Sequence, residues 1–264
     1  MGMNIIVCIK QVPGSNKVEV DPVTGVLKRD GVESKMNPYD LYALETALRL
    51  KETYGGTVKV ISMGPLQAMQ IIREAYAMGA DEGILLSDRK FAGADVLATS
   101  YTLSQGVREA GEFDLILCGK QTTDGDTAQV GPEMAEFLKI PSVSNVRRIV
   151  SVEDGAITVE MDMANTVEIA RIKFPCLLSV EKDIFMPRLP SYVKMRATKD
   201  REIKVIDFSS LEDQDQMKYG LNGSPTQVQR IFPPEPNIKR ELWDDSADEL
   251  ADKLFSKIKE CKFI

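Results

Sequence analysis

The chain has 264 residues, 43% of them hydrophobic, and a formal net charge of −7 at pH 7. A chain of this length can bury a substantial core, and its negative charge argues against non-specific binding to nucleic acid. The sequence contains no histidine. This excludes a Ser-His-Asp triad, a Cys-His pair, histidine metal ligands and a histidine general base.

The four cysteines give no sign of a disulfide framework or of a C-x-x-C motif. Cys8, Cys118 and Cys176 fall in or beside apolar runs, where a buried thiol is the ordinary state. The chain goes directly into a strand-like run without a signal peptide, and no apolar run approaches the ~20 residues of a membrane span. We therefore expect a cytoplasmic protein with no membrane span.

Short apolar runs alternate with amphipathic segments through the first half of the chain. The expected strands are Ile5–Ile9, Val58–Ser62, Ile84–Ser87 and Leu115–Gly119, and the expected helices are Tyr39–Thr53, Leu66–Ala77, Asp95–Ala110 and Thr127–Leu138. In the first helix Leu41, Leu44 and Leu48 recur at three- and four-residue steps, which gives one apolar face. The alternation predicts an α/β fold, mainly a parallel sheet with helices on both faces.

Residues 16–36 interrupt this alternation between the first strand and the first helix. Val18–Arg29 alternates at period two around a Pro/Gly turn, which is typical of a β-hairpin. The excursion is long for a strand-to-helix connection, which usually has about 2–6 residues. It is either a surface hairpin or a lid or subunit arm near the ligand end of the sheet.

The pattern changes again after residue 145. Four strand-like runs predict an antiparallel extension of the sheet, at Val146–Val152, Ala156–Met161, Thr166–Ile172 and Cys176–Val180. From about residue 207 the chain is polar and irregular until an amphipathic helix at Ala247–Lys259. We expect a nucleotide-binding domain over residues 1–206 and an arm over 207–264 that wraps around another surface.

The most informative segment is the loop Gly119–Gly131, which follows an apolar strand and precedes a helix. This layout places backbone N–H groups around a phosphate. Asp124 and Asp126 would repel a phosphate, so we expect backbone amides and threonine hydroxyls to hold a diphosphate. The aspartates would hold ribose hydroxyls or cap the helix, because Asp126 and Gln129 have capping-box spacing.

Other segments are expected at the same edge of the sheet. Ligands of open parallel sheets bind beyond the carboxyl ends of the strands. Those ends are Cys8–Lys10, Ser62–Gly64 and Gly119–Gln121, and helices begin there at Asn37–Asp40 and Phe91–Thr99. Five small or polar segments at one edge suit an adenine dinucleotide better than a mononucleotide.

Motifs along almost the whole chain resemble the β subunit of electron-transfer flavoproteins. They are V-C-I-K-Q-V-P, M-N-P-Y-D, V-I-S-M-G-P, A-M-G-A-D-E-G, F-A-G-A-D-V-L-A-T-S, G-K-Q-T-T-D-G-D-T-A-Q-V-G-P, F-P-C-L-L-S-V, M-P-R-L-P and G-S-P-T. The resemblance implies an adenine-nucleotide α-hydrolase-like fold and a larger α subunit that carries its own FAD. The C-terminal arm and its helix would contact that α subunit.

The resemblance and the strand ends together imply a set of cofactor-binding residues. We expect no catalytic side chain, because a flavin cofactor supplies the redox chemistry, and we expect no metal site. The predicted cofactor-binding residues are Cys8, Asn37, Pro38, Tyr39, Asp40, Ser62, Met63, Gly64, Asp95, Thr99, Gly119, Lys120, Gln121, Thr122, Thr123, Asp124, Gly125, Asp126, Thr127, Ala128, Gln129 and Val130.

Within the family, the sequence resembles the electron-bifurcating members. The similarity lies in the extended V-E-V-D-P-V-T-G-V-L-K-R-D-G-V segment, in F-A-G-A-D-V-L-A-T-S and in D-G-D-T-A-Q-V-G, where simple carriers tend to be more acidic. It implies an FAD that accepts hydride from NADH. The electrons would be split between ferredoxin and, through the α-subunit FAD, a dehydrogenase of acyl-CoA or 2-hydroxy-acid (lactate) type.

Two alternatives compete with this interpretation. In a non-bifurcating β subunit the same site would hold AMP as a structural ligand. An ATP-using or nucleotide-sensing protein on a related fold is disfavoured, because the chain lacks a basic phosphate loop and an obvious pair of metal-binding carboxylates beside it.

Residues 185–199 resemble the recognition loop of the family, in which a leucine inserts into an apolar pocket of the partner dehydrogenase. Leu189 would be that anchor and Tyr192 would contact the partner beside it. A loop packed against its own domain is the alternative.

Overall fold

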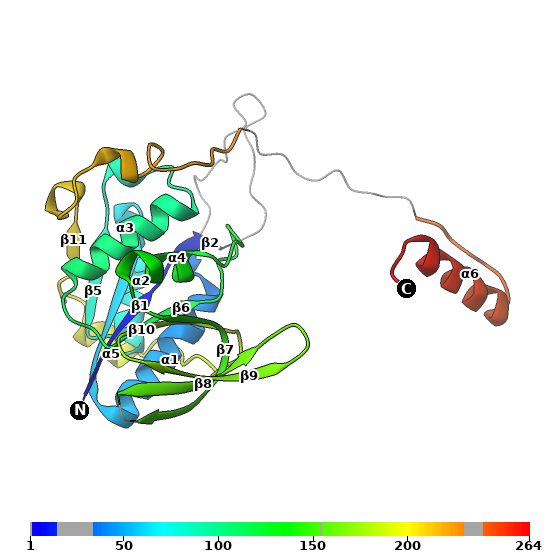
Figure 1. Ribbon diagram of the computed structural model, residues 1–264, viewed down its shortest axis with the longest axis horizontal. Coiled ribbons are helices and arrows are strands. Elements are labelled where there is room, and N and C mark those ends of the chain that lie inside the picture. Colours follow the sequence, from blue (N-terminus) through cyan, green and yellow to red (C-terminus); the bar gives the residue numbers. More distant parts are fainter. Residues whose placement is uncertain (1, 15–33, 154, 230–239) are drawn as a thin grey trace.

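A computed structural model describes residues 2–14, 34–153, 155–229 and 240–264. Its centre is a nine-stranded sheet in the order β11-β5-β4-β1-β6-β10-β7-β8-β9 (Figure 1). The strands of this sheet are β1 (Met3–Cys8), β4 (Gly56–Met63), β5 (Glu82–Leu86), β6 (Leu115–Gly119), β7 (Ser142–Glu153), β8 (Ala156–Asp162), β9 (Val167–Lys173), β10 (Cys176–Val180) and β11 (Lys204–Ile206). The helices are α1 (Pro38–Tyr54), α2 (Met69–Met78), α3 (Val96–Glu109), α4 (Val130–Leu138), α5 (Tyr192–Ala197) and α6 (Ala247–Glu260).

The predicted α/β class and the mainly parallel sheet are confirmed. All neighbours from β11 through β7 pair in parallel, and β8 and β9 add the antiparallel extension. One part of the prediction is wrong, because β10 is not antiparallel. It lies parallel between β6 and β7 and is buried along its whole length. Its nearly continuous apolar sequence is typical of an interior parallel strand.

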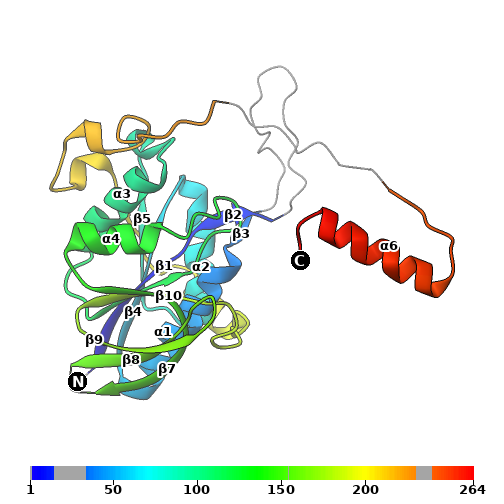
Figure 2. The ribbon, with the colours of Figure 1, turned by 45° about the vertical axis from the view of Figure 1, so that its right-hand side comes forward.

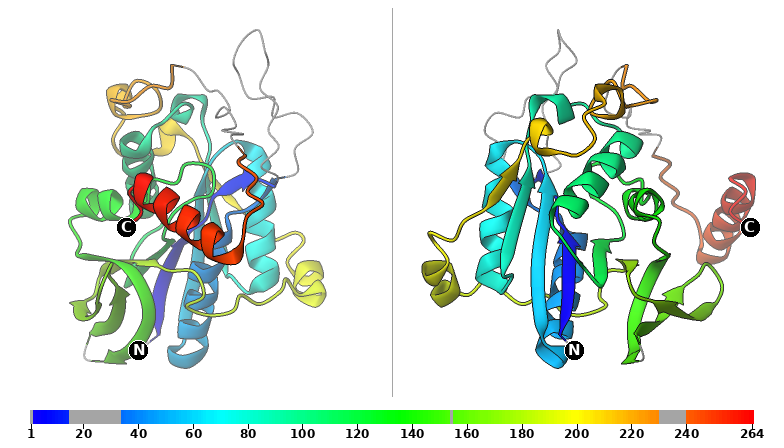
Figure 3. Two further views of the ribbon diagram at one scale, coloured as in Figure 1. Left: turned by 90° about the vertical axis from the view of Figure 1, so that its right-hand side faces the viewer. Right: turned by 60° about the vertical axis from the view of Figure 1, so that its left-hand side comes forward.

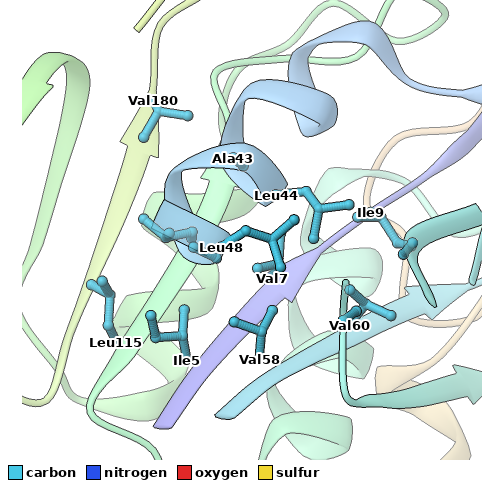
Figure 4. Close-up of a cluster of buried hydrophobic side chains, with 14 of the residues drawn as sticks. Ile5, Val7, Ile9, Ala43, Leu44, Leu48, Val58, Val60, Leu115 and Val180 are labelled. Atoms are coloured by element: carbon cyan, nitrogen blue, oxygen red, sulfur yellow. The ribbon is translucent and has the colours of Figure 1, made fainter. Parts of the chain in front are cut away.

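Helices cover both faces of the sheet. Buried side chains of α1 and α2 pack on one face, and those of α3 and α4 pack on the other. The right-hand view of Figure 3 shows the sheet between these two layers. In Figure 4, Leu44 and Leu48 of α1 lie against Val7 of β1 and Val58 of β4. The leucines that recur at three- and four-residue steps in α1 therefore face the core, as predicted.

The predicted hairpin at Val18–Arg29 lies outside the described residues. The segments on either side of it are described and pair with each other. Strand β2 (Gln11–Pro13) is antiparallel to β3 (Ser34–Met36). Pro13 and Ser34, which flank this segment, are therefore neighbours beside the end of β1.

The boundary between the domain and the C-terminal arm lies later in the chain than the predicted residue 207. Residues beyond 206 still belong to the core, because Phe208, Leu211 and Tyr219 are buried in the α3–α4 layer. Tyr219 contacts the rings of Phe91, Tyr101 and Phe208 at centroid distances of 5.2–5.8 Å. Helix α6 has no buried residue and stands apart from the domain in Figures 1 and 2. Periodicity missed this packing because isolated aromatic residues in an irregular segment carry no repeat.

Removal of the Tyr219 ring tests this placement. We expect Tyr219→Ala to lower the free energy of unfolding by about 3–5 kcal/mol, because it empties a fully buried aromatic site. Urea unfolding measures the change. Met217→Ala is the matched control, since Met217 is 68% exposed two residues away and should change stability by less than about 0.5 kcal/mol. Equal effects of the two substitutions would contradict the burial of this segment.

Candidate nucleotide site at the carboxyl edge of the sheet

The buried side chain of Asn37 joins the start of α1 to the loop that follows β6. Its Nδ2 donates to the carbonyl oxygen of Gln121 and to Oδ1 of Asp40, both at 2.9 Å. Its Oδ1 accepts from the backbone N–H of Thr123 at 3.2 Å. Asn37 therefore holds the loop instead of capping its own helix, which has no side-chain cap. Segments 84 residues apart thereby meet at one edge of the sheet.

Gly119 explains how closely these segments approach. A Cβ at this position would lie 2.6 Å from the carbonyl carbon of Tyr39 and 2.6 Å from Oδ1 of Asp40. Any side chain would collide with the main chain at the start of α1. The glycine is therefore required by contact within the protein, and it places the end of β6 directly against Asp40.

Asp40 is buried and its carboxylate is engaged by the protein on both oxygens. Oδ2 accepts from the backbone N–H of Lys10 at 2.7 Å, and Oδ1 accepts from Asn37. Burial raises the pKa of Asp40 to about 7, while the hydrogen bonds from Asn37 and Lys10 act in the opposite direction. The Asp40 carboxyl thus ties the end of β1 to the start of α1.

The charged side chains of the loop have partners within the protein. Nζ of Lys10 lies 2.7 Å from Asp124, and Nζ of Lys120 lies 2.5 Å from Glu181. Asp126 accepts from Nε2 of Gln121. Partial burial would favour the neutral acid, but the Lys10 ammonium lowers the pKa of Asp124 below its usual value. Asp124 therefore lies beside a compensating positive charge.

Helix α4 begins at Val130, three residues later than predicted. Asp126 and Ala128 have φ of 54° and 57°, values that a right-handed helix does not contain. The capping-box interpretation of Asp126 and Gln129 is wrong, since the N-cap is Gln129 and no side chain caps it. The positive dipole end of α4 and its first N–H groups thus face the loop without a side-chain cap.

The start of α3 belongs to the same edge but is tied to the C-terminal segment. Oδ1 of Asp95 accepts from the backbone N–H of Ala98 and so caps α3. Oδ2 accepts from the hydroxyl of Thr226 at 2.7 Å and from its backbone N–H at 3.0 Å. The hydroxyl of Ser100 donates to Glu133 at 3.2 Å and links α3 to α4. Thr99 lies in the first turn of α3, where its N–H donates to the Asp95 carbonyl.

The remaining predicted residues lie at the ends of β1 and β4. Cys8 is opposite Cys118 in the register of β1 and β6. Ser62 is buried and its hydroxyl has no hydrogen-bond partner within the described part of the chain. Met63 ends β4, and the N–H of Gly64 donates to the carbonyl of Leu86. The unpartnered Ser62 hydroxyl leaves one buried polar group at this edge unsatisfied.

Leu189 and Tyr192 are not part of this edge. The N–H of Ser191, which lies between them, donates to the carbonyl of Ala77 near the end of α2. The residues that follow α2 lie beside the start of β4, because the N–H of Asp81 donates to the carbonyl of Val58. The two residues therefore lie toward the amino edge of the sheet, on the α1–α2 side.

The pattern that describes the electron transfer flavoprotein domain matches residues 24–211. The chain belongs to the electron transfer flavoprotein family. A β subunit of an electron transfer flavoprotein from Clostridium acetobutylicum is 44% identical over 262 residues, which cover 99% of this chain and 100% of that protein.

Two further relatives of this flavoprotein chain carry other names. Subunit CarD of the caffeyl-CoA reductase–Etf complex from Acetobacterium woodii is 43% identical and covers 98% of both chains. Protein FixA from Azotobacter vinelandii is 42% identical over 97% of this chain and 94% of its own. The relatives thus match this flavoprotein chain over nearly their full lengths.

No helix among the described residues of this flavoprotein chain combines the length and the apolar content needed to cross a membrane.

The predicted set of cofactor-binding residues omits several polar residues that shape this candidate site. Lys10 and Glu181 lie within two residues of the carboxyl ends of strands at this edge, and that position was a usable signal. Thr226 belongs to the G-S-P-T motif, but its contact with Asp95 spans 131 residues. Neither spacing nor periodicity indicates so distant a partner.

The Asp40 carboxyl predicts a pH dependence for the stability of this flavoprotein chain. The pKa of Asp40 in the folded chain is about 7, which exceeds the value of about 3.9 in the unfolded chain. Between these two pH values the native state therefore holds a proton that the unfolded chain has lost. This stabilisation is complete below about pH 4 and is lost as the pH rises through about 7, a change of about 4 kcal/mol at most. We expect Asp40→Asn, which stays uncharged, to show a shallower fall of Tm between pH 5 and 8. An unchanged slope of Tm against pH in Asp40→Asn would contradict the raised pKa of Asp40.

Proposed function

We propose that this chain is the β subunit of a heterodimeric electron transfer flavoprotein and that it holds FAD at the carboxyl edge of the sheet. The observation that carries the proposal is the convergence of the Gly119–Val130 loop with the starts of α1 and α4, in a chain of this family. The carboxyl edge of an open parallel sheet is where such folds bind nucleotides.

Backbone groups would hold the diphosphate. Within the bend, the N–H of Thr123 is already bonded to Asn37, and those of Gly125 and Asp126 are bonded to Thr122. The other N–H groups of the Thr122–Thr127 bend and those of the first turn of α4, apart from Pro132, would be the donors for the diphosphate. Three features support the fit: α4 has no side-chain cap, Asp124 is neutralised by Lys10, and the buried Ser62 hydroxyl still lacks a partner. Lys10 and Lys120 are both in ion pairs, so backbone donors would carry most of the recognition.

The cofactor would supply the redox chemistry. When bound, FAD would accept a hydride from NADH and deliver one electron to ferredoxin and one, through the FAD of the α subunit, to a dehydrogenase of acyl-CoA or 2-hydroxy-acid (lactate) type. The residues of this chain would bind and orient the dinucleotide. The Asn37 and Asp40 contacts would keep the loop and the start of α1 in place around it.

Two surfaces would contact other subunits. The exposed apolar residues Leu242, Leu254 and Phe255 of the C-terminal arm would pack on the α subunit. Leu189 and Tyr192 would contact the dehydrogenase. They lie on the opposite side of the domain from Thr226, the last described point at which the C-terminal segment is bonded to the start of α3. The CarD relative is named as a subunit of a reductase–Etf complex, which supports assembly with such an enzyme.

The flavin content of the purified heterodimer tests the cofactor. We expect about two flavins per heterodimer, because each subunit would hold one FAD. Absorption spectra and chromatography of the nucleotides released by denaturation measure the ratio. About one flavin together with AMP would instead identify the non-bifurcating β subunit, and a complex without a nucleotide in this chain would refute the proposed site.

Substitution of Leu189 tests the docking surface. Leu189 is 88% exposed, so Leu189→Ala should leave folding and flavin content unchanged. Loss of a buried interface anchor should raise the KM for electron transfer to the dehydrogenase by about tenfold or more. Leu221→Ala is the matched control, since Leu221 is an exposed leucine on the α3 side of the domain. If Leu189→Ala and Leu221→Ala had identical steady-state kinetics, Leu189 would not be part of the interface.

A further inference from the structure

We propose that Glu45 of α1 is a positioning residue, which through Arg188 sets the conformation in which Leu189 is presented to the dehydrogenase. The inference rests on the proposed docking role of Leu189 and names a residue that would not itself touch the partner. It starts from an ion-pair cluster that the nucleotide site does not use.

Arg188 is held by two carboxylates of the same helix. Its Nε lies 2.8 Å from Oε2 of Glu45, and its Nη2 donates to Oε1 of Glu45 at 3.1 Å. Its Nη1 donates to Glu52 at 2.5 Å. The backbone N–H of Arg188 also donates to Oε2 of Glu45 at 3.1 Å. One carboxylate thus holds the main chain and the side chain of the residue that precedes Leu189.

Glu45 is a buried charge whose partners are the loop and its own helix. Its side chain is 2% exposed, whereas that of Glu52 is 58% exposed. Burial alone would raise the pKa of Glu45, but hydrogen bonds from Arg188 and Arg49 lower it below its usual value. A buried carboxylate that lost Arg188 would keep only the bond from Arg49. The loop therefore has one strongly preferred position on α1.

The loop is also held on the other side of Leu189. The N–H of Ser191 donates to the carbonyl of Ala77, and Nζ of Lys194 donates to the carbonyl of Met78. Pro187 and Pro190 further restrict the backbone on either side. Residues before and after Leu189 are therefore anchored to α1 and to the end of α2, while the leucine side chain projects into solvent.

This arrangement has a consequence for binding affinity. A flexible loop would lose conformational freedom when its leucine enters a pocket, and that loss weakens binding. A loop already held by Glu45 has largely lost this freedom in the unbound protein. Without the ion pair, the exposed side chains of Met186, Leu189 and Tyr192 would sample several conformations. Loss of the Glu45 carboxylate should therefore weaken docking and leave the electron-transfer step unchanged.

The test uses the purified heterodimer and, as acceptor, the flavin dehydrogenase isolated with the native complex. We expect Glu45→Gln to raise the KM for electron delivery by about fivefold with unchanged kcat and flavin content. Hydrogen exchange at the Arg188 amide should become faster, because that N–H loses a charged acceptor. Arg188→Gln, which leaves α1 and the Glu45 carboxylate in place, should raise the KM by a similar factor, and the KM of the double variant should be no higher than that of either single variant.

Glu160→Gln provides the matched control. It removes the ion pair between Glu160 and the largely exposed Arg148 on the antiparallel extension and should change neither the KM nor hydrogen exchange in the loop. A normal KM for both Glu45→Gln and Arg188→Gln, with a raised KM for Leu189→Ala, would overturn the positioning role and leave the docking role standing. A normal KM for Leu189→Ala would overturn both.

Discussion

The buried contact between Asn37, Asp40 and the end of β6 is the interaction on which the candidate site depends. Asn37 is the N-cap of α1 and Asp40 lies in its first turn, which approaches Gly119 too closely for any side chain at position 119. Because these polar groups are buried, each must keep its partner, and the partners lie on β1, α1 and the loop after β6. The loop is therefore held in one place before any ligand arrives.

That placement also compensates negative charge in the loop that is proposed to bind a nucleotide. Lys10 reaches Asp124 only because the end of β1 is beside the loop, and Lys120 is paired with the residue that follows β10. Charges that look unfavourable in sequence are compensated across strands. Backbone N–H groups and the dipole of α4 are then the remaining attraction for an anion.

Helix α1 connects the two surfaces for which functions are proposed. Its first turn carries Asp40 at the nucleotide edge, and further along the same helix Glu45 and Glu52 hold Arg188 on the α1–α2 side. One face of the helix, through Leu44 and Leu48, fills the core between these sites. The loop proposed for docking and the loop proposed for nucleotide binding are thus anchored to one rigid element, although they lie at different places on the domain.

The sequence by itself determined the alternation of strands and helices, the mainly parallel sheet and the position of the Gly119–Gly131 loop between a strand and a helix, because periodicity and glycine placement are local properties. Tertiary structure alone decided the parallel insertion of β10, the burial of Tyr219 and the late start of α4. It also decided that Asp40 and Asp95 are engaged by the protein itself. Each of these depends on partners distant in the chain, and no local pattern specifies which distant group meets a buried strand, ring or carboxylate.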